Sequence, residues 1–198
     1  MRLKGWRKRH SKIMCMGYGV KQRIHILGAS GSGTTTIAGL VCDALGYKHF
    51  DTDSYFWKPT EEPFTEIRPK EERLELMTRD LTDYEQWVLS GSLDGWGNPL
   101  LPLFDMVVFV YVPTDVRVER LKKREFNRYG DAVLPNGKRH ESTREFIEWA
   151  AEYDFGTREG RNLPRHESWL ENLKNPVLRI VNDNLDESVR MVIKAIEE

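Results

Sequence analysis

The alternation of apolar and polar positions along the chain indicates that strands and helices follow one another in turn. Short apolar runs bounded by turn residues predict five strands, at residues 23–27, 48–52, 87–90, 106–112 and 177–181. The fourth run reads Met-Val-Val-Phe-Val-Tyr-Val, and such a continuously apolar run is typical of a strand buried on both faces. We therefore expect a sheet that helices cover on both sides.

Apolar residues at helical spacing separate these runs. Ile37, Val41 and Leu45 share one face, which predicts a helix over residues 34–45 that ends at Gly46. The same spacing predicts helices at about residues 69–84 and 114–128, one ending near residue 156, one stopped by residues 175–176, and one at the C-terminal end.

This order of elements predicts an α/β fold of three layers, with a five-stranded parallel sheet and right-handed crossovers. Residues 114–176 are too many for one crossover helix, so we expect a helix followed by an inserted lid at about residues 130–160. A chain of 198 residues suits one such domain. We place it at residues 22–198, after a basic N-terminal arm at residues 1–21.

A glycine-rich segment follows the first predicted strand and opens the first predicted helix. Residues 28–36 read Gly-Ala-Ser-Gly-Ser-Gly-Thr-Thr-Thr, close to the phosphate-loop pattern G-x-x-x-x-G-K-[ST]. Thr35 stands at the position of the magnesium-binding hydroxyl, and Thr34 stands where the lysine is expected. The predicted nucleotide-binding residues of this loop are Gly28, Ala29, Ser30, Gly31, Ser32, Gly33, Thr34, Thr35 and Thr36.

Two other interpretations of the loop remain open. The glycines at 28, 31 and 33, with Asp51 after the second strand, invite comparison with a dinucleotide-binding turn, and a merely structural turn is a third possibility. The spacing is not G-x-G-x-x-G, and no convincing tyrosine–lysine pair follows. The run of three threonines also suits magnesium and phosphate better than a nicotinamide pyrophosphate, so we favour the phosphate loop.

Further candidates stand where predicted strands end, at the edge where parallel sheets bind ligands. Asp51 and Asp53 end the second strand, and such a pair can orient or deprotonate an acceptor hydroxyl or serve a magnesium site; turn chemistry is the simpler alternative. Gly91 follows the third strand. Aromatic residues gather nearby and could line an acceptor site or pack under a loop: Tyr55, Phe56, Trp57, Phe64 and Trp96.

Together these segments resemble the nucleoside-monophosphate-kinase-like group of P-loop phosphotransferases, which includes adenylate, shikimate and gluconate kinases. The resemblance covers roughly residues 23–198 and is specific at the loop. It implies ATP with Mg²⁺ as the donor, a lid that closes over the phosphates, and an arginine at Arg68 for an acceptor anion. Asp51-x-Asp53 is similar to the D-x-D of shikimate kinases, which implies a hydroxyl acceptor, whereas the lid implies a nucleotide.

The resemblance also bears on the missing lysine. In adenylate-kinase-like enzymes, arginines at the base and end of the lid clamp the phosphates, and Arg120 and Arg124, then Arg158 and Arg161, match these positions. Losing one charge-assisted contact of this kind costs roughly 2–5 kcal/mol, which other cations can offset. Arg117 and Arg128 share the helix face of the first pair, and there we favour a solvated face.

Composition and charge limit the remaining classes. The net charge of −1 gives no global field toward nucleic acid or membrane, and no apolar run is long enough to span a bilayer. Cys15 and Cys42 form no metal-ligand or disulfide pattern. We therefore expect a cytoplasmic protein with a small-molecule partner.

The function predicted from these features is ATP-dependent phosphoryl transfer to a nucleotide, nucleoside or polyol. Asp53, Arg120 and Arg124 are its expected catalytic residues, and Thr35 and Asp53 its expected magnesium residues. Asp51, Trp57, Arg68 and Gly91 are expected to bind the acceptor. The alternative is a nucleotide-binding sensor with little kinase activity, because the loop lysine is absent.

Overall fold

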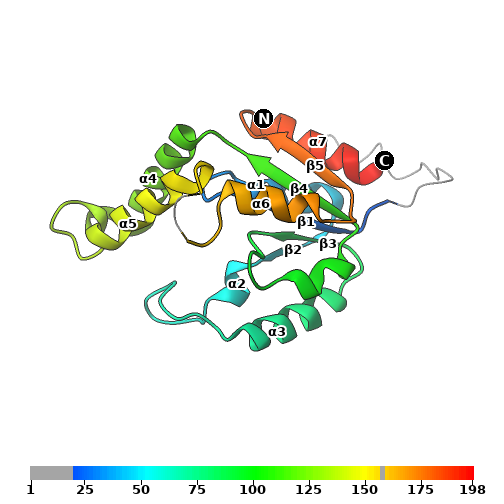
Figure 1. The fold of residues 1–198 in the computed structure, drawn as a ribbon, viewed down its shortest axis with the longest axis horizontal. Coiled ribbons are helices and arrows are strands. Elements are labelled where there is room, and N and C mark those ends of the chain that lie inside the picture. Colours follow the sequence, from blue (N-terminus) through cyan, green and yellow to red (C-terminus); the bar gives the residue numbers. More distant parts are fainter. Residues whose placement is uncertain (1–19, 157–158) are drawn as a thin grey trace.

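Five strands form the centre of the computed structural model, which describes residues 20–156 and 159–198 (Figure 1). They are β1 (Arg23–Gly28), β2 (Lys48–Asp51), β3 (Trp87–Ser90), β4 (Met106–Tyr111) and β5 (Val177–Val181). They lie in the order β2-β3-β1-β4-β5, and every neighbouring pair is parallel. The predicted sheet is confirmed, and no strand end differs from its predicted position by more than one residue.

Helices connect the strands. The α-helices are α1 (Thr34–Leu45), α2 (Asp53–Phe56), α3 (Lys70–Thr82), α4 (Thr114–Tyr129), α5 (His140–Ala151), α6 (Leu163–Glu171) and α7 (Leu185–Glu197). Short 3₁₀ helices are η1 (Asn98–Leu103), η2 (Gly130–Val133) and η3 (Glu152–Asp154). The periodicity gave no sign of α2 or of the 3₁₀ helices. The region predicted as a lid contains η2, α5 and η3.

The sheet is buried on both faces, as its apolar strands require. Along β4, Met106, Val108 and Val110 pack toward α1 and α7. The alternate residues Val107 and Phe109 belong to the core on the opposite face, which α3, η1 and α6 cover. This alternation follows from the period of two in a strand, and it produces the predicted three layers.

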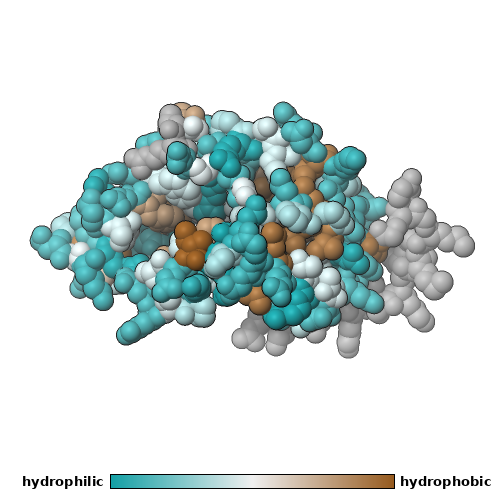
Figure 2. All heavy atoms as spheres, turned by 60° about the horizontal axis from the view of Figure 1, so that its bottom comes forward, coloured by the Kyte–Doolittle hydropathy of each residue, from teal (hydrophilic) through white to brown (hydrophobic). Residues whose placement is uncertain are grey.

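One end of the sheet carries the projecting part of the molecule. Figure 1 shows α4 and α5 beyond the carboxyl ends of the strands, where they pack against each other. Figure 2 shows that this end is largely hydrophilic and that hydrophobic surface on the viewed face occurs mainly over the body. Within the described residues, no helix is both long and apolar enough to cross a membrane. The predicted arm lies almost entirely outside the described residues, as does Cys15.

Candidate functional site

A pocket of about 990 Å³ opens at the carboxyl ends of β1, β2 and β3. Its walls come from the glycine-rich loop between β1 and α1, from the segment after β2, and from α4 and the residue Arg161 before α6. Most of the site residues predicted from the sequence line it: Gly28, Ala29, Ser30, Gly31, Gly33, Thr34, Thr35, Thr36, Asp51, Asp53, Trp57, Arg68, Gly91, Arg120, Arg124 and Arg161. Arg158 lies outside the described residues.

The glycine-rich loop has a backbone that only glycine accommodates easily. Gly31 and Gly33 adopt φ angles of 82° and 93°. A Cβ at Gly28 would lie 2.4 Å from the carbonyl oxygen of Val110, so the loop packs directly on β4. Ser32 differs from its neighbours because the whole residue is buried, and its backbone N–H donates to the carbonyl oxygen of Ala29 at 3.1 Å, so it does not line the pocket.

The first turn of α1 follows this loop without a side-chain cap. Helix geometry leaves the first N–H groups of such a turn without intrahelical acceptors. The positive end of the helix dipole lies at the same place, so the loop and the start of α1 together form a site suited to an anion.

Asn182, which sequence reasoning missed, holds this loop from behind. Its Nδ2 atom donates to the Ser32 carbonyl oxygen at 2.8 Å, and its Oδ1 atom accepts a hydrogen bond from Ser188 at 3.2 Å. A Cβ at Gly33 would lie 2.7 Å from that Nδ2 atom, which gives a second reason for glycine there. Asn182 directly follows β5, so the rule that singled out Asp51 at a strand end also points to it.

Asp51 joins the phosphate loop to the acidic segment after β2. Its Oδ2 atom accepts a hydrogen bond from the Thr35 hydroxyl at 3.0 Å and another from the Ser90 hydroxyl at 3.2 Å. Its Oδ1 atom accepts from the backbone N–H of Asp53 at 2.9 Å. The carboxylate beside the Thr35 hydroxyl is therefore that of Asp51, whereas the sequence analysis expected Thr35 and Asp53 to share the magnesium site.

Asp53 opens α2 and lines the pocket beside these groups. Desolvation by the pocket walls and the neighbouring Asp51 charge raise the pKa of Asp53, while Arg161, Arg124 and Arg128 act in the opposite direction. A carboxylate with a raised pKa is a better proton acceptor than an ordinary aspartate. Among the described residues, no group of three or more His, Cys, Asp or Glu side chains could hold a metal ion by itself.

Besides Arg68, four arginines of the described residues line the pocket, and their partners differ. Nε and Nη2 of Arg124 both donate to Glu125, and Nη2 of Arg120 donates to the carbonyl oxygen of Asn182 at 3.3 Å. Arg128 is exposed, as the sequence suggested, and it also lies over the Phe64 ring, 5.4 Å from its centroid. Arg161 donates from Nη2 to the Ser30 hydroxyl at 2.7 Å.

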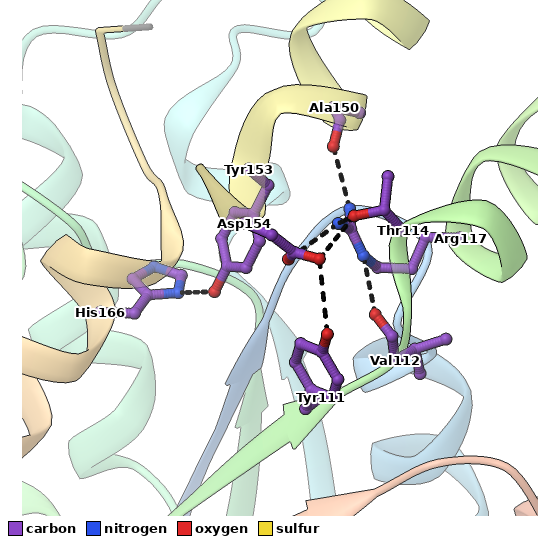
Figure 3. A network of polar contacts seen from close by, with 8 residues as sticks. All are labelled: Tyr111, Val112, Thr114, Arg117, Ala150, Tyr153, Asp154 and His166. Atoms are coloured by element: carbon purple, nitrogen blue, oxygen red, sulfur yellow. Dashed lines mark hydrogen bonds and ion pairs between the residues drawn. The ribbon is translucent and has the colours of Figure 1, made fainter. Parts of the chain in front are cut away.

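Arg117 has a different role from the arginines that share its helix face. Its side chain is fully buried and donates to the carbonyl oxygens of Val112 and Ala150, both at 2.9 Å. It also donates to the Thr114 hydroxyl and pairs with Asp154 at 3.1 Å (Figure 3). The expected solvated position is wrong here, because α5 and η3 cover the start of α4.

The other wall of the pocket is a hairpin at residues 57–67, which we call the acceptor flap. It is closed by a bridge between Trp57 and Ile67 and by the backbone hydrogen bond from Lys58 to Glu66. Trp57 and Phe64 contact each other edge to face at 6.0 Å. Trp96, considered from the sequence with these aromatics, is instead buried in the core.

Arg68 directly follows the acceptor flap and Gly91 directly follows β3, and both line the pocket. Arg68 donates to the Tyr55 carbonyl oxygen and pairs with Glu72, so much of its donor capacity is already used. Gly91 has a φ of 105°, and a Cβ there would overlap Thr52. The glycine is therefore needed for packing whether or not a ligand approaches it.

The region predicted as a lid contacts the acceptor flap. Arg139, just before α5, pairs with Glu62 of the flap at 2.6 Å and lies 4.0 Å from the centroid of the Tyr129 ring. Sequence reasoning missed this pair, because the two residues lie 77 positions apart.

Comparisons with known proteins agree with this architecture. YqaC of Bacillus subtilis (strain 168), described as uncharacterized, is 45% identical over 175 residues, which cover 88% of this chain and 97% of YqaC. A cytidylate kinase of Archaeoglobus fulgidus is 32% identical over 114 residues, or 52% of this chain and 62% of that kinase.

A solved structure with the same fold is the shikimate kinase of Bacteroides thetaiotaomicron. It superposes with a TM-score of 0.52 at 20% identity, covering 90% of this chain and 99% of that one. No protein-family profile matches the sequence. The chain belongs to the same family as YqaC, and its fold is that of the nucleoside-monophosphate-kinase-like P-loop phosphotransferases.

Proposed function

We propose that the protein is a cytoplasmic phosphotransferase that moves the γ-phosphoryl group of ATP to a hydroxyl or phosphate oxygen of a small molecule. The observation that carries this proposal is the hydrogen bond between Thr35 and Asp51. It joins the phosphate loop and the acidic segment in one pocket, with arginines on the facing wall.

The oxygen atoms in this pocket fit Mg²⁺, which favours hydroxyl, carboxylate and water ligands. We propose that the Thr35 hydroxyl and the Asp51 carboxylate hold the ion, with Asp53 adjacent. A hydrogen-bonded hydroxyl and carboxylate at the end of a phosphate loop support this assignment. When bound, the ion would neutralise charge on the donor phosphates.

The residues of the chain would then divide the reaction between them. The loop amides and the start of α1 bind the phosphates. Asp53 accepts the proton of the acceptor hydroxyl while the oxygen of that hydroxyl forms a bond to the γ-phosphorus. The bond between that phosphorus and the bridging oxygen breaks, and ADP leaves. For a phosphate acceptor, which carries no proton to lose, Asp53 would only orient the acceptor.

The chemistry of the pocket limits the acceptor. The match to a cytidylate kinase favours a nucleotide. The paired carboxylates favour a hydroxyl, and Trp57 and Phe64 offer ring faces to a planar base or a sugar. A panel of nucleosides, nucleoside monophosphates and polyols therefore covers the acceptors that the site suggests.

Two measurements test the proposal. Mg²⁺–ATP should stabilise the protein against thermal unfolding, by about 2.7 kcal/mol at a hundred times its dissociation constant, whereas NAD and NADP should not. ADP release, coupled to a spectroscopic signal, should rise with at least one acceptor of the panel. Stabilisation by a dinucleotide and not by ATP would overturn the assignment of the loop.

The second candidate is a nucleotide sensor without transfer activity. It is favoured by Thr34, which leaves the loop without its own cation. Stabilisation by ATP with no ADP release across the whole panel would support this candidate over the first.

A further inference from the structure

The phosphate loop carries no positive charge of its own. Residues 28–36 are glycine, alanine, serine and threonine only, and Thr34 occupies the position of the lysine. A cation next to the transferring phosphoryl group is among the largest contributions to this type of catalysis. If the protein transfers phosphoryl groups, another side chain must supply that charge.

Four of the five described arginines that line the pocket are poorly placed for this role, and one of them, Arg68, is already paired with Glu72. The charge of Arg124 is balanced by Glu125, to which two of its nitrogens donate. Arg120 reaches the backbone after β5, and Arg128 lies over the Phe64 ring of the acceptor flap. From the sequence, Arg120 and Arg124 were the expected catalytic arginines.

Arg161 is the pocket arginine whose guanidinium reaches the loop itself. Its Nη2 atom lies 2.7 Å from the Ser30 hydroxyl, and the Trp149 ring packs 5.2 Å from its central carbon. Its Nε atom is buried and has no acceptor among the described residues. None of the described carboxylates lies within ion-pair distance of it, and Asp53 acts on its charge only from farther away.

A partly buried guanidinium with no carboxylate in direct contact is stabilised when an anion joins it. Burial lowers the pKa of Arg161, and the nearby Asp53 is the largest influence in the opposite direction. Arg161 contacts Ser30 of the phosphate loop and lines the same pocket as Asp53. A phosphoryl group that passes from ATP on the loop to an acceptor beside Asp53 moves within this pocket.

We propose that Arg161 is the catalytic cation that replaces the loop lysine of other P-loop phosphotransferases. The inference rests on the proposed function and adds to it which residue stabilises the transferred phosphoryl group. Arg161 comes from the segment before α6, 131 residues after Ser30, so the charge is supplied in the same pocket by a different part of the chain.

The test exchanges the two positions. Arg161→Ala, Thr34→Lys and the double variant are compared with the parent protein for ATP turnover, with the best acceptor of the panel or, without one, as slow ATP hydrolysis. Affinities for Mg²⁺–ATP and Mg²⁺–ADP are measured on the same proteins. Arg144→Ala is the matched control, because Arg144 is a half-exposed arginine of α5 that pairs with Glu141 and Glu148 of its own helix.

We expect Arg161→Ala to lower turnover at least about 100-fold and to weaken ATP binding more than ADP binding. Thr34→Lys should change the parent little but should restore turnover at least tenfold in the Arg161→Ala background. Arg144→Ala should match the parent in turnover and in both affinities. Arg161→Lys, with an unchanged melting temperature, would keep part of the activity and exclude a folding defect.

Three results would overturn the inference. One is turnover within threefold of the parent in Arg161→Ala. Another is an equal gain from Thr34→Lys in both backgrounds, since independent sites simply add. The third is equal weakening of ATP and ADP binding by Arg161→Ala, which would indicate a structural contact with Ser30. The affinity comparison needs no turnover, so it decides the role of Arg161 even if no acceptor is found and the proposed function fails.

Discussion

Replacing Arg117 should test how strongly the base of the lid is fastened to the body. The side chain is fully buried and donates to two backbone carbonyls, to the Thr114 hydroxyl and to Asp154 (Figure 3). Arg117→Met keeps much of the volume but removes the donor from these acceptors, so Asp154 retains only the hydroxyls of Thr114 and Tyr111 and loses its cation. The carboxylate of Asp154 is the costliest of them, because its side chain is only 18% exposed.

The expected loss follows from the network. Removing one partner of a buried, hydrogen-bonded ion pair costs about 3–5 kcal/mol. With an m-value of about 2 kcal/mol per molar, the midpoint of urea unfolding should fall by about 2 M. Arg144→Ala is the control, since its ion pairs with Glu141 and Glu148 are half-exposed and worth at most about 1 kcal/mol.

A double variant separates the charge from the packing. Adding Asp154→Asn to Arg117→Met removes the carboxylate charge that has lost its cation, so it should recover part of the lost free energy of unfolding. If Arg117→Met costs less than about 1 kcal/mol, like Arg144→Ala, the network does not fasten the lid. If Asp154→Asn lowers the free energy of unfolding by the same amount in the parent protein and in Arg117→Met, the two residues are not coupled.

Three further outcomes are expected. Asp53→Asn should lower phosphoryl transfer far more than ATP affinity, because the carboxylate acts on the acceptor; kinetics and titration check this, and unchanged turnover would reduce Asp53 to a turn residue. Glu62→Gln should speed hydrogen exchange both in the acceptor flap and around Arg139, whereas Glu61→Gln, one position away, should not; equal rates in the two variants would deny that the pair joins them. Burial lowers the pKa of His25 to about 4 and that of His166 to about 3, both from 6.5. Each histidine remains neutral in the folded protein while the unfolded chain takes up a proton, so the free energy of unfolding should fall between pH 6.5 and about 4, by up to about 1.4 kcal/mol per pH unit for each histidine. Urea titrations should show a shallower decline in His166→Gln, and an unchanged slope would contradict the lowered pKa.

The sheet could be predicted because its signals are local. β4 is continuously apolar since both of its faces are covered, and α1 shows one apolar face that ends at Gly46. The short helix α2 was missed because four residues are too few to show a helical periodicity. Its first residue, Asp53, is held by a hydrogen bond from its backbone N–H to the Asp51 side chain, which the hydrophobic pattern does not reveal.

The site could be predicted only as far as it follows strand ends. The carboxyl edge of a parallel sheet brought together the loop, Asp51 and Gly91, as the topology requires. Contacts between distant segments leave no such pattern, and Glu62 with Arg139 is an example.

The arginines of α4 show the same limit. Arg117 and Arg124 share a helix face, yet Arg117 is enclosed by α5 and η3 while Arg124 faces the pocket. Periodicity fixes the direction in which a side chain leaves the helix axis. What that side chain meets depends on the tertiary neighbours at each turn.

The place of Arg161 in the chain affects when the phosphate-binding site is fully formed. A lysine in a phosphate loop is attached to the first helix and is present whenever the loop is folded. Arg161 belongs to a different segment, which precedes α6 and reaches the loop through Ser30. If Arg161 supplies the catalytic cation, the phosphate site is complete only while that segment is docked. Binding of ATP and ordering of residues 159–163 are then coupled, and each must favour the other by the same free energy. Hydrogen exchange in that segment should therefore slow with ATP in the parent protein, and slow much less in Arg161→Ala.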